Sequence, residues 1–343
     1  MASKKILVTG GAGYIGSHTA VELVRAGYEP VILDNFSNSE RFIVGRVRKI
    51  TGRNVPLCTG DCSVPADVAK VFKKEGRFHG IIHFAALKAV GESVAQPLRY
   101  YRNNVGGMLT MLEAADRYKV PHFVFSSSCT VYGEPDKLPV REDAPVKNAA
   151  SPYGETKKIA ERMLETFLQS GVPVKAVSLR YFNPIGAHPS ALIGELPLGT
   201  PKNLVPFVTQ TAAGIRKVLQ VYGDDYKTPD GTCIRDYIHV IDLAAAHVRA
   251  LGYLEKKRGP FYDIFNVGTG RGQSVLGIVK TFEKVTGVKV PYKIALRRSG
   301  DIAEIYAAAG KAKKVLGWSA KLSLEEALRS SWAWQKTLRS GKR

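Results

Sequence analysis

The sequence predicts an α/β fold, in which a doubly wound parallel sheet of about seven strands is followed by a smaller mixed α/β domain. Two observations predict it. Short apolar runs rich in Val, Ile and Phe recur along the chain without polar alternation, as expected of strands buried on both faces. Stretches of helix length lie between the first six runs. Such alternation builds right-handed crossover units and a parallel sheet covered on both sides.

The elements follow in order along the chain. Strands are expected over residues 5–8, 31–33, 55–58, 80–84, 122–125, 175–179 and 262–267. Apolar stripes predict helices over 15–26, 105–115 and 159–168. After Phe182 the chain becomes rich in Pro, Gly and polar residues, and a helix is expected over roughly 204–220. We therefore place one domain over residues 1–182, to whose sheet a strand near 261–267 returns, and a second over 183–343.

Composition excludes several classes of protein. The 343 residues, 45% of them apolar, suffice for sizeable cores. No run approaches the ~20 apolar residues of a membrane helix, and Met1 to Lys5 lead directly into the first strand, which leaves no room for a signal peptide. The four scattered cysteines have neither zinc spacing nor a disulfide pattern. We expect a cytoplasmic protein without a bound metal or a membrane partner.

The net charge of +20 would attract phosphates of any kind. The basic residues are nevertheless spread along the chain, and no RNA-recognition signature or zinc finger accompanies them. We therefore expect a solvated basic surface and no nucleic-acid partner.

A glycine-rich turn joins the first strand to the first helix. Gly10, Gly13 and Gly16 allow a tight turn and a close approach of the backbone to a pyrophosphate, which the helix N-terminus would face. Asp34 ends the second strand, where it would accept hydrogen bonds from ribose hydroxyls and repel a 2′-phosphate. The alternative is a glycine-rich turn without a ligand. We favour a Rossmann-type site for NAD rather than NADP.

Two further strand ends fit this site. Asp61 and Cys62 follow the third strand, from which an acid can reach the adenine amino group. Phe84, Ala85 and Ala86 follow the fourth, where small residues let the backbone approach the cofactor, although core packing would explain them equally well.

Tyr153 and Lys157 lie four residues apart at a helix start and so share one helical face. A tyrosine has a pKa near 10, which a neighbouring ammonium and an oxidised nicotinamide would both lower. Tyr153 could then take a proton from a hydroxyl as hydride leaves the same carbon, with Ser128 bonded to the reacting oxygen. Without the other motifs, Tyr153 and Lys157 could be surface residues with no catalytic role, and Ser128 could be a cap at a strand end.

Together these residues resemble the extended short-chain dehydrogenase/reductase superfamily and, within it, the family of UDP-glucose 4-epimerases. The segments that carry the resemblance are VTGGAGYIGSH, LDNFSNS, HFAALKAVGESV, NNVGG, FSSSCTVYG, SPYGETK, LRYFNPIGAHPS, KNLVPF, GTCIRDYIHV, RRSGDIAE and SSWAWQ. They extend from about Lys4 to Gln335, nearly the whole chain.

The resemblance implies a role for each matching residue. Tyr153 would be the catalytic base, Lys157 the ribose anchor and Ser128 the partner of the 4-hydroxyl. The implied NAD contacts are Gly10, Gly13, Tyr14, Ile15, Gly16, Asp34, Asn35, Phe36, Ser37, Asn38, Ser39, Asp61, Cys62, Phe84, Ala85, Ala86, Leu87, Lys88, Asn103, Ser126, Tyr153, Lys157 and Phe182. The implied UDP-sugar contacts are Lys88, Ser128, Tyr153, Asn183, Asn203, Leu204, Arg235, Arg298, Asp301 and Ile305.

The chemistry of the substrate residues agrees with these roles. Asn203 opens a helix with Pro206 in its first turn, which favours an anion site, and guanidinium groups such as Arg235 and Arg298 suit a diphosphate. The plainer alternatives pair Arg235 with Asp236 and Arg298 with Asp301. At the position of Ile305 the family carries a bulky or a small residue that closes or opens the pocket to an N-acetyl group. The intermediate Ile305 predicts weak acceptance.

The expected activity is interconversion of UDP-glucose and UDP-galactose at C4 through a 4-keto sugar. A 4,6-dehydratase would need an Asp-Glu pair where Cys129 and Thr130 stand. A UDP-glucuronate 4-epimerase and a non-catalytic NAD-binding regulator remain as alternatives. The helices that begin near Gln96 and Tyr153 have wide apolar faces, and in the family such helices form a four-helix bundle, so the resemblance implies a homodimer.

Overall fold

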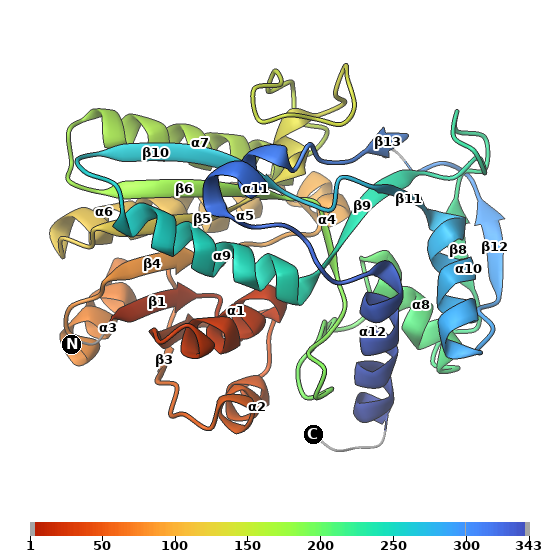
Figure 1. Cartoon of the computed structure of the whole chain (residues 1–343), viewed down its shortest axis with the longest axis horizontal. Helices are drawn as coiled ribbons and strands as arrows, with labels where there is room; N and C mark the ends of the chain where they lie inside the picture. Colours follow the sequence, from red (N-terminus) through yellow and green to blue (C-terminus); the bar gives the residue numbers. More distant parts are fainter. Residues whose placement is uncertain (1–3, 299, 340–343) are drawn as a thin grey trace.

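The computed structural model describes residues 4–298 and 300–339, and its largest element is a seven-stranded parallel sheet (Figure 1). The strand order is β10-β6-β5-β4-β1-β2-β3. The strands are β1 (Lys5–Thr9), β2 (Glu29–Asp34), β3 (Leu57–Thr59), β4 (Gly80–His83), β5 (His122–Ser128), β6 (Lys175–Tyr181) and β10 (Phe261–Val267). The predicted fold class is confirmed, and β10 lies beside β6 at the sheet edge.

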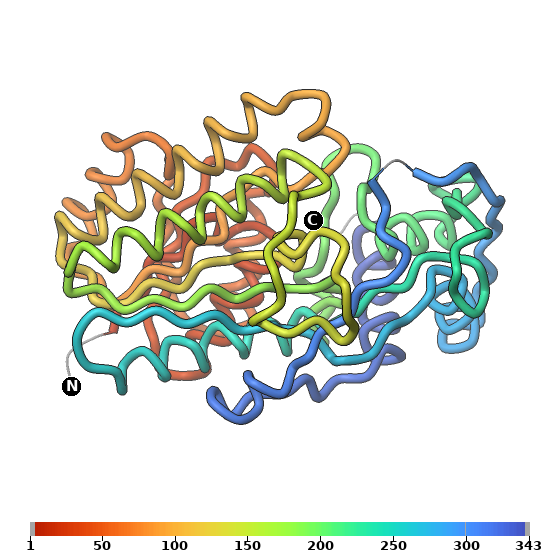
Figure 2. Tube along the Cα trace, turned by 90° about the horizontal axis from the view of Figure 1, so that it is seen from above, coloured from red at the N-terminus to blue at the C-terminus, as the bar shows by residue number. Residues whose placement is uncertain are grey.

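Helices cover both faces of this sheet. The helices α3 (Pro65–Glu75), α6 (Gly106–Arg117) and α7 (Pro152–Gln169) pack on one face, and α1 (Tyr14–Arg25) and α9 (Val240–Glu255) on the other. Figure 2 shows α6 and α7 on the opposite side of the strands from α9. In β1, Leu7 belongs to one apolar cluster, while Ile6 and Val8 belong to the other. Both faces are buried, which explains why these strands lack polar alternation.

Shorter elements complete this part of the chain. The helix α2 (Phe42–Thr51) packs against α1, and α11 (Gly310–Leu316) packs near β10. Between β4 and α6 lie α4 (Val90–Ala95), α5 (Pro97–Tyr100) and a π-helical turn, Tyr101–Val105. A short 3₁₀ helix, Cys129–Tyr132, follows β5. No helix among the described residues has the length and apolar character to cross a membrane.

The remaining elements gather beyond the carboxyl ends of the central strands (Figure 1). The strand β9 (Ile234–His239) pairs with β7 (Asn183–Ile185), β11 (Gly272–Ser274) and β13 (Glu304–Ile305), and β8 (Leu219–Tyr222) pairs with β12 (Tyr292–Ala295). The helices here are α8 (Leu204–Ala212), α10 (Val275–Thr286) and α12 (Leu324–Arg339). An apolar cluster that includes Val208, Ile278 and Leu328 holds them together.

The helix expected over 204–220 is wrong in its second half. The helix α8 ends at Ala212, and Gly214 adopts a φ of +73°, which an L side chain would disfavour. Residues Leu219 to Tyr222 then form β8, in which buried and exposed side chains alternate. Alternation at every second residue indicates a strand with one buried face. The alternating segment is too short to be recognised in the sequence.

Candidate active site

The glycine turn after β1 leaves no room for side chains. A Cβ at Gly16 would lie 2.3 Å from the carbonyl oxygen of Gly10, and one at Gly10 would lie 2.9 Å from the backbone nitrogen of Ala85. Gly10 also adopts a φ of +66°. Gly13 precedes α1 and has no side chain to cap it, so the first N–H groups of the helix can face an anion. These features fit the pyrophosphate of a dinucleotide.

The predicted cofactor residues follow the carboxyl ends of neighbouring strands. Residues 10–16 come after β1, 34–39 begin at the end of β2, 61–62 follow β3, 84–88 follow β4, Ser126 lies in β5 and Phe182 follows β6. In a parallel sheet these ends share one edge, so the fold brings the residues together. Asn103 lies in the π-helical turn, and such turns are frequent at functional sites.

Asp34 is held rigidly at the end of β2. Its carboxylate accepts hydrogen bonds from the backbone nitrogens of Ala12 and Phe36, both at 2.9 Å, and from Ser39 Oγ at 2.8 Å. A carboxylate has about four acceptor positions, so roughly one is left for a ribose hydroxyl. Arg41 lies over the ring of Phe36, with 4.5 Å between the guanidinium carbon and the ring centroid.

The acid after β3 is also fixed. Asp61 accepts hydrogen bonds from Asn35 Nδ2 at 2.8 Å and from the nitrogen and hydroxyl of Ser63. Burial raises the pKa of Asp61, but the bonds from Ser63 and Asn35 outweigh it and leave the pKa below its usual value. The neighbouring Cys62 is buried, which raises the pKa of its thiol to about 12 and keeps it protonated.

Asn104, which the sequence reasoning missed, anchors the loop that follows β4. Its side chain accepts a hydrogen bond from the backbone nitrogen of Leu87 at 2.8 Å and donates to the carbonyl of Leu87 and to Thr156 Oγ1, both at 3.0 Å. The 84–88 loop is thereby tied to the first turns of α7. The signal in the sequence was the Asn103-Asn104 pair, of which we assigned only the first residue.

The catalytic candidates meet where β5 ends and α7 begins. Lys157 is buried, donates to the carbonyl of Ser126 at 2.6 Å and lies 6.0 Å from the centroid of the Tyr153 ring. Ser128 Oγ accepts from Thr130 N at 3.2 Å and from Thr130 Oγ1 at 3.0 Å, so it does cap the short 3₁₀ helix. Its own hydroxyl proton remains able to donate, and a hydrogen bond between Ser128 and Tyr153 lowers the pKa of the phenol.

The pKa of Tyr153 differs from the expectation. Burial raises it to about 12, and the bond with Ser128 offsets only part of that rise. Burial also lowers the pKa of Lys157 to about 7, although the Glu161 carboxylate raises it in part. The ammonium is therefore only partly charged near neutral pH and does not make the phenol acidic by itself. This weakens one of the two expected causes of acidity; the other is the positive charge of an oxidised nicotinamide.

A buried ion pair lies beneath these residues. Arg180 Nε and Nη2 donate to the two carboxylate oxygens of Glu161 at 2.9 and 2.7 Å, and Ser127 Oγ donates to Glu161 at 2.5 Å. The pair joins β5 and β6 to α7, which carries Tyr153 and Lys157. Removing one partner would leave an uncompensated buried charge and cost about 3–5 kcal/mol.

The predicted substrate residues face the same edge from the second group of elements. Asn203 precedes α8 and Leu204 is its first residue, while Asn183 begins β7. Ile305 lies in β13, pairs with Arg235 of β9, and shares an apolar cluster with Cys129 and Phe182. The strands β9 and β13 thus adjoin the residues that follow β5.

The two arginines share one carboxylate. Arg298 donates to Asp301 at 2.7 and 3.1 Å, and Arg235 Nη2 lies 3.8 Å from the same side chain. The alternative pairing of Arg235 with Asp236 is not found, because Asp236 instead accepts hydrogen bonds from residues 269, 270 and 307. The pairing of Arg298 with Asp301 is present, and with Arg235 nearby it forms a cluster of two cations and one anion.

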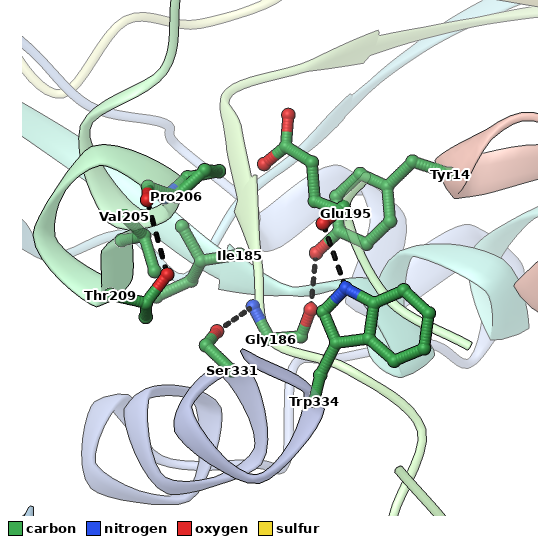
Figure 3. Close-up of a pocket in the computed structure, with 9 residues that line it drawn as sticks. All are labelled: Tyr14, Ile185, Gly186, Glu195, Val205, Pro206, Thr209, Ser331 and Trp334. Carbon is green, nitrogen blue, oxygen red and sulfur yellow. Dashed lines mark hydrogen bonds between the residues drawn. The ribbon is translucent and has the colours of Figure 1, made fainter. Parts of the chain in front are cut away.

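A small pocket lies where the glycine turn meets the second group of elements (Figure 3). The Tyr14 hydroxyl donates to the carbonyl of Gly186 at 2.6 Å, and Trp334 Nε1 donates to the carbonyl of Glu195 at 2.8 Å. Tyr14 is among the predicted site residues, whereas Glu195 and Trp334 are not, because only the fold brings α12 against residues 186–195.

Comparison with known proteins places this arrangement in a family. The GDP-mannose 4,6-dehydratase family model matches residues 7–331. A UDP-glucose 4-epimerase of Bacillus subtilis is 52% identical over 330 residues, which cover 96% of each chain. The chain belongs to this family, and within it to the UDP-glucose 4-epimerases.

Solved structures agree with this assignment. The crystal structure of the UDP-glucose 4-epimerase from Stenotrophomonas maltophila, with bound NAD and formylated UDP-arabinopyranose, is 46% identical, has a TM-score of 0.95, and covers 98% of this chain and 99% of its own. That from Bifidobacterium longum, in complex with NAD+ and UDP, is also 46% identical, with a TM-score of 0.94 and coverages of 98% and 100%.

The residues after β5 distinguish this family member from the dehydratases that give the family model its name. Cys129 and Thr130 follow Ser128 directly. Cys129 is buried, which raises the pKa of its thiol to about 12, and both Thr130 donors engage Ser128. Neither supplies the carboxyl group that elimination of water would need.

Proposed function

We propose that this protein is an NAD-dependent epimerase that interconverts UDP-glucose and UDP-galactose at C4 through a transient 4-keto sugar. The observation that carries the proposal is the meeting of Ser128, Tyr153 and Lys157 at the sheet edge that also carries a glycine turn shaped for a pyrophosphate. The relatives' activity agrees, and it does not favour a UDP-glucuronate 4-epimerase or a non-catalytic regulator.

In the proposed mechanism Tyr153, as the phenolate, takes the proton of the 4-hydroxyl and later returns one to the 4-keto oxygen, while Ser128 donates a hydrogen bond to that oxygen. Bound NAD would supply the redox chemistry, namely uptake of hydride from C4 and its return to the opposite face of the sugar. The backbone of residues 10–16 would hold its pyrophosphate, Asp34 its adenosine ribose, and Lys157 its nicotinamide ribose. The keto sugar turns about its bond to the diphosphate between the two transfers.

The UDP moiety would supply the binding energy. Arg235 and Arg298 would pair with the diphosphate, and Asn183, Asn203 and the first turn of α8 would line the rest of the site. A firm grip on UDP and a loose grip on the sugar allow the sugar to turn. Residues 1–182 with β10 would then form the NAD-binding domain, and most of 183–343 the UDP-sugar domain.

Incubation with UDP-galactose, without added NAD, tests the proposal. We expect UDP-glucose to accumulate until the two sugars reach equilibrium, as followed by chromatography, and NAD to be released from the purified protein on denaturation. A protein that carries no NAD and leaves both sugars unchanged would contradict the proposal.

Ile305 is proposed to limit the size of the sugar's 2-substituent. Its side chain is only 3% exposed and packs with Cys129 and Phe182, so the space beside it depends on its volume. We expect weak turnover of UDP-N-acetylglucosamine, which Ile305→Ala should increase and Ile305→Tyr should abolish while UDP-galactose turnover persists. Absence of any N-acetylated product at high enzyme concentration, in both the unaltered protein and Ile305→Ala, would refute this role.

We also propose a homodimer through a four-helix bundle, to which each chain contributes the helices that begin near Gln96 and Tyr153. Apolar side chains on α5, on α6 and on the preceding α4 lie open to solvent, with Val94 62%, Leu98 75% and Leu109 50% exposed. Such a patch is typical of an interface. Light scattering should give twice the chain mass, and Leu98→Glu should return the mass to that of one chain.

We further propose a role in galactose metabolism in the cytoplasm, where the four free thiols would stay reduced.

A further inference from the structure

One carboxylate joins two of the residues assigned to the site. Glu195 Oε1 accepts a hydrogen bond from Asn203 Nδ2 at 2.6 Å and lies 3.4 Å from Lys88 Nζ. Lys88 belongs to the loop after β4, on the cofactor side, and Asn203 precedes α8, on the substrate side. The Glu195 side chain is only 12% exposed, whereas that of Lys88 is 45% exposed. Glu195 therefore bridges the two sides of the site.

The backbone at Glu195 is held by α12. Trp334 of α12 donates to the Glu195 carbonyl at 2.8 Å. A Cβ on Gly194 would lie 2.5 Å from the Trp334 ring, so the indole packs directly on the backbone before Glu195. The charge of Glu195 also raises the pKa of Tyr14, after the larger effect of burial. The position of the Glu195 backbone is thus set by its contacts with Trp334.

The bond from Asn203 decides how that amide is turned. A carboxylate only accepts hydrogen bonds, so Asn203 must direct its nitrogen to Glu195 and keep its oxygen for another donor. The Asn203 side chain does not cap α8, and the first N–H groups of the helix are left for an anion. The amide oxygen can then accept a hydrogen bond from a hydroxyl group of the sugar.

We propose that Glu195 is a positioning residue for the UDP-sugar: it orients the Asn203 amide and ties the N-terminus of α8 to Lys88. The inference rests on the proposed epimerase function. Glu195→Gln removes the charge that Lys88 meets and weakens the bond from Asn203. Because a hydrogen bond to a charged group is stronger than a neutral one, we expect KM for UDP-galactose to rise about tenfold while kcat changes less than about twofold.

The test compares variants of the full-length, NAD-containing enzyme. Glu283→Gln is a matched control, because Glu283 also accepts from an ammonium, Lys289 at 2.9 Å, and from an amide, Val290 N at 2.8 Å, but lies on α10. It should leave KM unchanged. If Glu195 acts through Asn203, Glu195→Gln should add little to the loss already caused by Asn203→Ala.

Calorimetric titration with UDP-galactose separates the two possible failures. An unaltered protein that binds UDP-galactose without converting it would contradict the proposed function alone, and the same titration would still compare Glu195→Gln with Glu283→Gln. Equal affinities in those two variants, or additive losses from Glu195→Gln and Asn203→Ala, would overturn the role of Glu195. Thermal unfolding midpoints equal to that of the unaltered protein establish that the variants are folded.

Discussion

Tyr153→Phe is expected to lower kcat by about 10²–10⁴-fold, the usual contribution of a general base, while NAD and UDP-sugar binding persist. The change removes only the phenol oxygen, and the ring keeps its place at the start of α7. Initial rates with UDP-galactose measure the loss. Bound NAD and the affinity for UDP, measured on the same preparation, show whether the site is otherwise intact.

A conservative change nearby provides the comparison. Ser128→Ala removes the donor that lowers the pKa of the phenol but leaves the phenol itself, so a smaller loss and a shift of the pH profile to higher pH are expected. Near-normal turnover by Tyr153→Phe would exclude Tyr153 as the base. Loss of NAD from that variant would point to a structural role instead.

The second large effect is a loss of stability in mild acid. Six of the seven histidines are buried, and burial lowers the pKa of each to about 3 or 4. They are His18, His83, His122, His188, His239 and His247. In the unfolded chain they titrate near 6.5. Below that pH the unfolded state takes up protons that the folded state does not, so the free energy of unfolding falls as pH falls.

The six contributions add up to a large effect. Between pH 7 and 5.5 the free energy of unfolding should fall by roughly 7 kcal/mol, a large part of the usual 5–15 kcal/mol of a folded protein. The acids with lowered pKa, such as Asp61 and Glu255, add their effect only at lower pH. Urea unfolding at saturating NAD over this range measures the change.

One histidine can be tested singly. His122 Nε2 is buried and has no hydrogen-bond partner among the described residues, so His122→Gln should reduce the pH dependence by about one sixth. Unfolding free energies that stay constant from pH 7 to 5 would show that these side chains become protonated within the folded protein.

Much of the site followed from the sequence because its residues adjoin the ends of elements with strong local signals. The glycine turn and Asp34 lie at the ends of recognisable strands, and Tyr153 and Lys157 lie at the start of a helix. In a parallel sheet the ends of those strands must meet, so no knowledge of packing was needed. The length of α8 was misjudged because the alternation of buried and exposed residues in Leu219–Tyr222 is too short to be recognised as a strand in the sequence.

Other features depend on packing between distant segments. Glu195 meets both Lys88 and Asn203, and Trp334, 139 residues further on, donates to its backbone carbonyl. Asn104 lies in a π-helical turn that no local sequence pattern predicts, and from there it forms hydrogen bonds with Leu87 and Thr156. The pKa of Tyr153 lies above its usual value because burial outweighs the hydrogen bond with Ser128, and burial also lowers the pKa of the neighbouring Lys157.

By itself, then, the sequence determined the parallel sheet, the cofactor turn and the identity of the catalytic candidates, since these depend on local periodicity and on residues adjacent in the chain. The tertiary structure alone decided which buried groups share a hydrogen-bond partner and how desolvation shifts their protonation. Both quantities depend on distances between segments and on exclusion of water, which a linear pattern does not encode.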